Sequence, residues 1–96
     1  MRKYEIMFIV RPDLEEGTIK SVFDSMKALL EEQGATVIES KEMGQKELAY
    51  EVNKYKNGYY FYFLIEATDA KAIKEFDRVA LINENVIRHL VVKVGE

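Results

Sequence analysis

The sequence predicts an α+β fold in which two helices cover one face of a four-stranded antiparallel sheet. Two segments, near residues 18–33 and 70–80, repeat apolar side chains at the three- and four-residue spacing of a helix. The segments around them are rich in β-branched and aromatic residues, which gives the order β-α-β-β-α-β. Right-handed crossovers place both helices of this order on one face, which is the ferredoxin-like arrangement.

Length and composition agree with one domain spanning residues 1–96. Hydrophobic residues make up 48% of the chain, enough for a core, and 32% charged residues favour a soluble surface. There is no cysteine, so disulfides and thiolate chemistry are excluded, which fits a cytoplasmic protein. Glu5 interrupts any signal-peptide apolar region, and no apolar run approaches the ~20 residues of a membrane span, so no membrane is expected as a partner.

Residues 2–10 predict the first strand, because apolar side chains fill one face and part of the other. The first face carries Tyr4, Ile6, Phe8 and Val10, and the second carries Lys3, Glu5, Met7 and Ile9. Pro12 ends this strand, since proline cannot donate to a ladder. A helix follows from Glu15 or Thr18 to Gln33, and Gly34 is placed to adopt the left-handed conformation that closes it.

Residues 35–41 predict a second strand, and residues 48–52 alternate with Leu48, Tyr50 and Val52 on one face. Between them, residues 42–47 are interpreted as a bend or a bulge within one long strand, with Gly44 supplying the unusual backbone angles. Residues 53–58 predict a basic hairpin loop that leads into the next strand.

Residues 57–66 form the most aromatic stretch and follow an Asn-Gly turn signal, so they predict the third strand. We expect Tyr59, Phe61, Phe63 and Ile65 to face the core, and Tyr60, Tyr62, Leu64 and Glu66 to face away from it.

Thr68 or Asp69 can cap a second helix over residues 70–80, whose inward residues are expected to be Ala72, Ile73, Phe76 and Ala80. Residues 82–85 predict a turn and residues 86–94 the last strand. Alternation leaves two orientations for this strand, with either His89, Val91 and Lys93 or Leu90 and Val92 turned toward the helices, and we favour the first as far as Val91. No helix then remains for the opposite face of the sheet, and a contiguous apolar surface of this kind marks a binding site.

No combination of residues predicts catalysis, so the protein is not expected to be an enzyme. A nucleophile needs a base beside it, and the serines have no identifiable partner. His89 is the only histidine and has neither triad nor metal companions, so a structural role is expected for it. We expect no cofactor, no metal and no small-molecule substrate.

Binding of single-stranded RNA by the sheet alone is one alternative. RNA-recognition domains share this element order and stack bases on aromatics of the third strand, where Tyr60 and Tyr62 lie here. The signature of those domains has a basic residue before the glycine and a small residue where Tyr60 stands, so the match is weak. A net charge of −3 and a pI near 5.3 also differ from those of an autonomous nucleic-acid binder. A regulatory domain that binds a small molecule is a third possibility on the same fold.

Four blocks of the sequence resemble the ribosomal protein S-six family of the bacterial small subunit. The first is Arg-Lys-Tyr-Glu at residues 2–5, and the second is Met-Gly-Gln-Lys-Glu-Leu-Ala-Tyr-Glu-Val at residues 43–52. Lys54 followed by Asn-Gly-Tyr-Tyr at 57–60 forms the third, and Asn-Val-Ile-Arg-His-Leu-Val-Val-Lys at 85–93 the fourth. The blocks are in order and correctly spaced, and together they cover essentially the whole chain.

This resemblance implies a structural component of the small ribosomal subunit that binds the central domain of small-subunit ribosomal RNA. It also implies a small basic protein partner, ribosomal protein S-eighteen, which would supply much of the positive charge. Matching basic positions carry over an RNA-contact role to Arg2, Lys46, Lys54, Arg88 and Lys93, and Lys3 and Lys56 are added as neighbouring cations. Antiparallel pairing is expected to bring the first strand, the last strand and the central hairpin, and with them these cations, within reach of a common edge. The surface for the partner protein is expected to consist of Met7, Ile9, Tyr60, Tyr62, Leu64, Leu90 and Val92.

Overall fold

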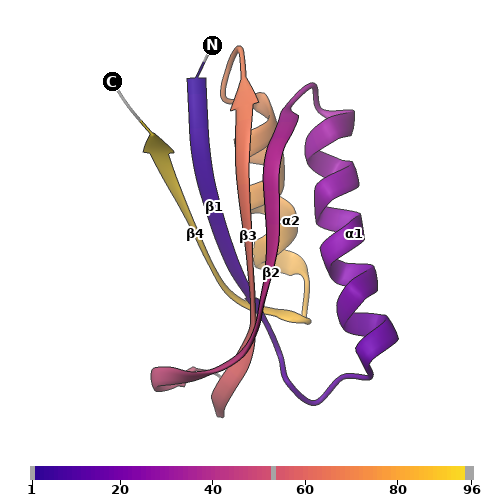
Figure 1. Cartoon of the computed structure of the whole chain (residues 1–96), viewed down its shortest axis with the longest axis vertical. Helices are drawn as coiled ribbons and strands as arrows, with labels where there is room; N and C mark the ends of the chain where they lie inside the picture. The colour runs from indigo at the N-terminus through magenta and orange to yellow at the C-terminus, as the bar shows by residue number, and fades with distance from the viewer. Residues whose placement is uncertain (1, 53, 95–96) are drawn as a thin grey trace.

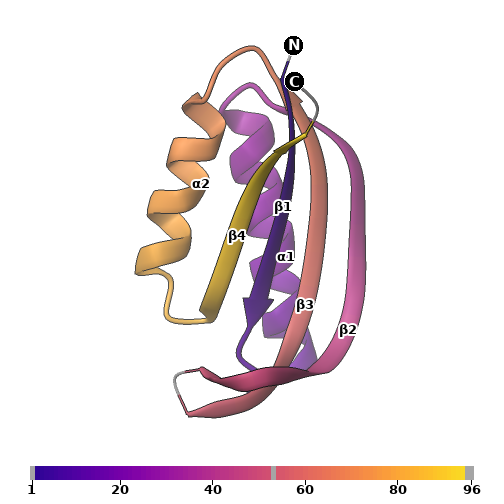
Figure 2. The ribbon, with the colours of Figure 1, turned by 90° about the vertical axis from the view of Figure 1, so that its left-hand side faces the viewer.

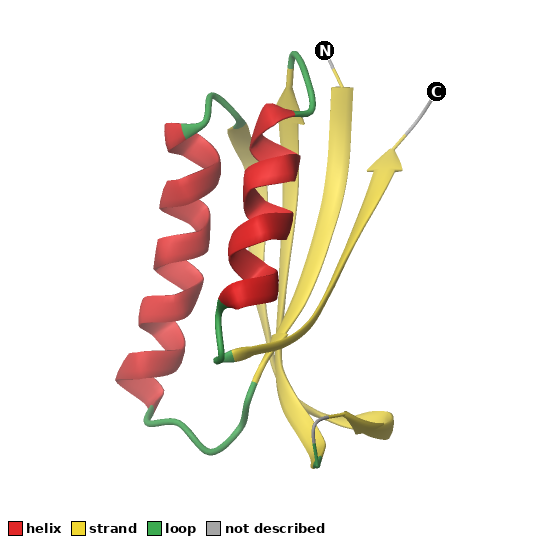
Figure 3. Cartoon of the chain, turned by 180° about the vertical axis from the view of Figure 1, so that it is seen from behind, coloured by secondary structure: helices red, strands yellow, loops and turns green. Residues whose placement is uncertain are grey.

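The computed structural model describes residues 2–52 and 54–94, and it has the predicted element order. Strand β1 spans Arg2–Val10, helix α1 Glu16–Glu32, strand β2 Thr36–Val52, strand β3 Tyr55–Ala67, helix α2 Lys71–Ile82 and strand β4 Val86–Val94. All pairings are antiparallel in the sheet order β2-β3-β1-β4 (Figure 1). Both helices lie on one side of the sheet, as Figures 2 and 3 show, so the predicted fold class is confirmed.

The core lies between the helices and the inward face of the sheet. Phenylalanine rings dominate it, and Phe8 of β1 lies at their centre, with its ring centroid 5.3 Å from Phe61 and 5.9 Å from Phe76. Phe23 of α1 lies 5.0 Å from Phe61, so the rings join both helices to the sheet. Aromatic pairs of this kind contribute about 0.5–1.5 kcal/mol beyond the area they bury. The inward faces expected for β1 and β3 are those that the structure buries, although Tyr59 is only partly covered.

Helix α1 ends as its glycine predicts. Gly34 has a φ of +93°, and its N–H donates to the carbonyl of Glu31 at 3.1 Å. The N–H of Ala35 donates to the carbonyl of Leu30 at 3.0 Å, which completes a Schellman motif. Helix α2 runs to Ile82, two residues further than the predicted end at residue 80, and the Asp69 carboxylate accepts a hydrogen bond from the backbone N–H of Lys71.

Strand β2 is one long strand with a bulge at its centre, which confirms the second interpretation of residues 42–47. The register with β3 shifts between Val37 and Glu39 and again between Glu42 and Gly44. Gly44 has a φ of +83°, which a residue with a Cβ rarely adopts. Each bulge adds local twist and bends the strand.

The predicted loop over residues 53–58 is wrong in its extent. Strand β3 already begins at Tyr55, and its pairing with β2 continues to the Val52–Tyr55 pair. Residues 55, 57 and 58 still pair with β2. The basic residues of this stretch were therefore a poor indicator of a loop. Asn53, which belonged to the predicted loop, lies outside the described residues.

Strand β4 has the predicted orientation. His89 pairs with Phe8 and Val91 pairs with Ile6, so both face the helices. The Nε2 atom of His89 lies 2.6 Å from the Asp77 carboxylate of α2, and its ring meets Phe76 edge-on. This is the structural role expected for the histidine.

Candidate partner and RNA interface

The face of the sheet opposite the helices is here termed the open face. Cross-strand register divides its centre into rows, in which Tyr62, Met7 and Leu90 form one row and Tyr60, Ile9 and Arg88 the next. All residues predicted to meet the partner protein lie on this face: Met7, Ile9, Tyr60, Tyr62, Leu64, Leu90 and Val92. Leu90 is 59% exposed and Val92 45%, although both are apolar. The helices therefore leave a largely apolar surface uncovered.

Ile9 differs from the rest of this set, because it is only 6% exposed. Gly58 of the neighbouring strand packs directly against it, so that a Cβ on Gly58 would lie 2.4 Å from the Ile9 Cγ2 atom. A protein that docks on the open face would meet the side chains around Ile9 rather than Ile9 itself.

The end of the β2–β3 hairpin covers that part of the open face. We call residues 46–52 and 54–58 the arm. Between the Glu47–Asn57 and Val52–Tyr55 pairs, β2 contains residues 48–51 and β3 only Lys56, so β2 bulges. The arm curls across the end of the sheet toward the side of β4 (Figures 1 and 2).

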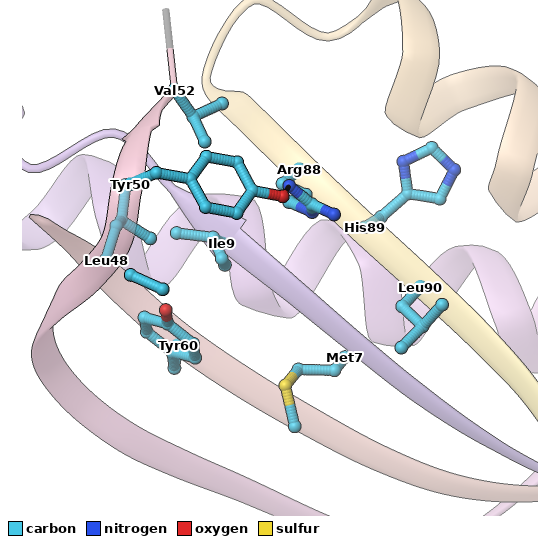
Figure 4. Close-up of a pocket in the computed structure, with 10 residues that line it drawn as sticks. Met7, Ile9, Leu48, Tyr50, Val52, Tyr60, Arg88, His89 and Leu90 are labelled. Carbon is cyan, nitrogen blue, oxygen red and sulfur yellow. Dashed lines mark hydrogen bonds between the residues drawn. The ribbon is translucent and has the colours of Figure 1, made fainter. Parts of the chain in front are cut away.

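Two tyrosines of the arm, Tyr50 and Tyr55, contact β4 and the segment between β1 and α1. Tyr50 reaches Arg88 of β4, whose guanidinium donates a hydrogen bond to the Tyr50 hydroxyl and lies 5.4 Å from the ring centroid (Figure 4). Tyr55 donates a hydrogen bond to the Asp13 carboxylate at 3.4 Å, beside Arg11. Arg11 and Asp13 form an ion pair, which holds the pKa of the Asp13 carboxyl below its ordinary value.

Two pockets lie side by side on the open face and share Met7 and Leu90. One of about 210 Å³ lies under the arm and is lined by Met7, Ile9, Leu48, Ala49, Tyr50, Val52, Tyr60, Arg88, His89 and Leu90 (Figure 4). The other, of about 220 Å³, is lined by Glu5, Ile6, Met7, Tyr62, Leu90 and Val92. Both are small and mostly apolar, which suits side chains of a docking protein.

The open face also contains charged groups that interact with its tyrosines. The Tyr62 hydroxyl donates to the Glu5 carboxylate at 2.7 Å, and this hydrogen bond raises the pKa of Tyr62 to about 12. Lys41 of β2 lies 5.7 Å from the Tyr62 ring centroid, and Lys46 lies 5.9 Å from that of Tyr60. The faces of both tyrosine rings are thus approached by lysines of the same chain.

The predicted RNA-contact residues fall into two groups instead of sharing one edge. Lys46, Lys54, Lys56 and Arg88 gather around the arm. Arg2, Lys3 and Lys93 lie where β1 begins and β4 ends, at the opposite end of the sheet (Figure 1). Antiparallel pairing places the start of β1 beside the end of β3, whereas the arm adjoins the end of β1. The expected common edge is therefore wrong.

Sequence reasoning missed Tyr50 and Glu5 as members of the site. Tyr50 appears in the sequence only as one alternating strand residue, and its contact with Arg88 depends on the bulge that turns the arm. Glu5 was placed on the correct face, but its hydrogen bond with Tyr62 joins diagonal neighbours on adjacent strands. Cross-strand register is the signal that would reveal the contact of Glu5, whereas residues 48–51 have no register partner from which the contact of Tyr50 could be found.

Comparison with known proteins identifies the family. The family model for ribosomal protein S6 matches residues 3–93. This chain belongs to the ribosomal protein S6 (S-six) family. A similar protein, the small ribosomal subunit protein bS6 of Phytoplasma australiense, is 42% identical over 93 residues, which are 97% of this chain and 99% of that relative. The crystal structure of 30S ribosomal protein S6 from Thermotoga maritima has a TM-score of 0.91 and 25% identity, covering 96% of this chain and 86% of that one.

Membership in the S-six family identifies a ribosomal protein of the small subunit, with RNA binding and a role in translation. The S-six family is one of ribosomal structural proteins and not a family of enzymes. Within residues 2–52 and 54–94, no three acidic or histidine side chains gather as a metal site would require. Neither helix of the described chain is long and apolar enough to cross a membrane.

Proposed function

We propose that this chain binds the central domain of small-subunit ribosomal RNA as one half of a pair with the basic ribosomal protein S-eighteen, in the cytoplasm. The observation that carries the proposal is the open face, where Leu90 and Val92 are exposed and two apolar pockets lie side by side. An exposed apolar surface of this extent favours a protein partner.

Charge supports a composite surface. The chain carries 17 acidic and 14 basic residues, so it lacks the excess of positive charge that phosphate binding requires. A basic partner docked on the open face would supply that charge beside the lysines of this chain. Electrostatic attraction between an acidic and a basic protein would also accelerate their association.

The group around the arm is our candidate for RNA contact. Lys54 and Lys56 are exposed there, and Lys46 is exposed close by on the same hairpin. Lysine side chains act as point charges on flexible stems, and phosphate contacts of this kind set the register of a protein on RNA. Arg2, Lys3 and Lys93 form a second candidate group, separated from the first by the length of the sheet.

The alternative of base stacking on Tyr60 and Tyr62 is less favoured by the geometry. Lys46 and Lys41 already approach the two ring faces, and the Tyr62 hydroxyl is engaged with Glu5. A stacked base would have to displace both lysines before it gained the roughly 1–3 kcal/mol that stacking contributes per base.

Binding of the purified chain to a central-domain ribosomal RNA fragment, with and without S-eighteen, tests the proposal across a salt series. We expect tight binding only when both proteins are present, with a salt dependence that reports the phosphates contacted by the pair. Equally tight binding by this chain alone would instead support the stacking alternative. Failure of the two proteins to associate would reject the pairing.

A further inference from the structure

An acidic side chain lies within the apolar part of the open face. Glu5 of β1 has Leu64 of β3 and Val92 of β4 as its cross-strand neighbours. It forms one wall of the pocket of about 220 Å³, whose other walls are mostly apolar. A carboxylate in such surroundings has few protein groups near it that interact favourably with its charge.

The chain orients this carboxylate without neutralising it. The Tyr62 hydroxyl donates to its Oε2 atom at 2.7 Å. Lys41, which lies over the Tyr62 ring, forms its ion pair with Glu39 at 3.3 Å. Across the described residues, no lysine or arginine nitrogen lies within 4.0 Å of the Glu5 carboxylate. Water solvates the charge in the free protein, because Glu5 is exposed.

Docking of a protein over this surface would remove that water. A carboxylate buried with only a neutral hydroxyl beside it is strongly unfavourable, because hydrogen bonds from one phenol do not replace its hydration. A favourable complex therefore needs a cation at this position. Phosphate groups of RNA are unsuitable occupants, since they would repel the carboxylate.

We infer that the pocket beside Glu5 receives one arginine or lysine side chain of the protein that covers the open face. Its aliphatic stem would pack on Met7, Leu90 and Val92, while its charged end pairs with the Glu5 carboxylate. Arginine and lysine have an apolar stem and a charged end. This pocket has apolar walls and one carboxylate, so it matches both parts of such a side chain. The inference rests on the proposed function, because it specifies how the basic partner binds.

The decisive experiment titrates purified S-eighteen against wild type and Glu5→Gln in a calorimeter. Glutamine has the same shape and still accepts the Tyr62 hydrogen bond, but it lacks the charge. Glu31→Gln, on the exposed side of α1, is the matched control. It changes the net charge by the same amount, but at a site away from the open face. We expect Glu5→Gln to weaken binding by roughly 30-fold or more, as for other buried charge pairs, and Glu31→Gln to change it by no more than about twofold.

A double-mutant cycle then locates the cation. Each arginine and lysine of S-eighteen is replaced in turn by methionine, and each variant is titrated against wild type and Glu5→Gln. One substitution should weaken binding to wild type but have little further effect on Glu5→Gln. Tyr62→Phe, which removes the hydroxyl that orients Glu5, should weaken binding severalfold.

The failures of the two proposals can be told apart. If wild type and Glu5→Gln bound S-eighteen with the same affinity, the inference would be overturned, but the pairing of the two proteins would stand. The absence of any coupled cation would overturn the inference as well. If wild type itself did not bind S-eighteen, the proposed function would be rejected, and this inference with it.

Discussion

Arg88 of β4 both donates a hydrogen bond to the hydroxyl of Tyr50 and lies over its ring. This contact is the tie between the arm and the strand at the far side of the open face. It also engages the one arginine in the predicted RNA-contact group around the arm, so Arg88 has a structural role before any RNA binds.

Tyr50→Ala should loosen the arm without unfolding the protein. Both partners are exposed, so the free energy of unfolding is expected to change by less than about 1 kcal/mol. Amide hydrogen exchange over residues 48–52 should become faster, because opening the arm no longer requires breaking the contact with Arg88 and so costs less free energy. Tyr50→Phe keeps the ring but loses the hydroxyl and should give an intermediate rate. Unchanged exchange in both variants would show that the backbone pairing alone holds the arm.

Gly58→Ala should destabilise the protein. The added Cβ would lie 2.4 Å from the Ile9 Cγ2 atom and 3.1 Å from the carbonyl oxygen of Val10, so the Ile9 side chain or one of the two strands must shift. Overpacking of this kind costs about 1–3 kcal/mol, which urea unfolding would measure. Gly17→Ala is the control, because its Cβ meets nothing within 4 Å in the first turn of α1, and it should stabilise by about 0.5–1 kcal/mol. Equal stability of Gly58→Ala and wild type would contradict the close approach.

Stability should fall in strong alkali as Tyr62 ionises. The hydrogen bond to Glu5 raises the pKa of Tyr62 from 10.0 to about 12, so the folded state favours the neutral phenol. Its contribution is therefore fully present below pH 10.0 and is lost as the pH rises through about 12. The difference in phenolate absorbance between wild type and Tyr62→Phe isolates this titration. In Glu5→Gln the pKa should move back toward its ordinary value, and a pKa that stayed near 12 would assign the shift to another cause.

Leu90→Asp should disrupt pairing with the basic partner while leaving the monomer folded. Leu90 is 59% exposed at the junction of the two pockets, so a charge there costs little in the free protein but would be buried in the complex. Loss of a central apolar contact weakens protein interfaces by roughly 30-fold or more. Leu81→Asp provides the comparison, since Leu81 is 72% exposed on α2 in the helix layer. Equal binding by both variants would place the interface elsewhere.

The sequence was sufficient for the sheet and its two faces because apolar periodicity is a local property. Phe8, Phe61 and Phe63 lie where alternation placed them. For β4, alternation left two orientations open, and only its register with β1 decides that His89 and Val91 face inward. The arm was not predictable in this way. Its curl depends on a register shift between two strands, and no pattern within β2 fixes how many residues oppose Lys56.

The basic residues illustrate the same limit. Each was recognised as an exposed cation, but their grouping depends on which strand ends meet. Lys93 pairs with Tyr4 and thus lies with Arg2 and Lys3, whereas Lys54 lies between the paired residues Val52 and Tyr55 at the other end of the hairpin, in the arm. Pairing of this kind joins residues distant in the chain, so composition and spacing carry little information about it.

The central position of β1 has a consequence for how the protein is made. Lys3 pairs with Val94 on one side and with Glu66 on the other, so the first strand synthesised is flanked by the third and the last. The sheet remains incomplete until β4 has left the ribosomal exit tunnel. Since these pairs join segments far apart in the sequence, we expect folding to be slower than in proteins built from local contacts. Until β4 emerges and pairs with it, β1 would therefore expose the hydrogen-bonding groups of one edge.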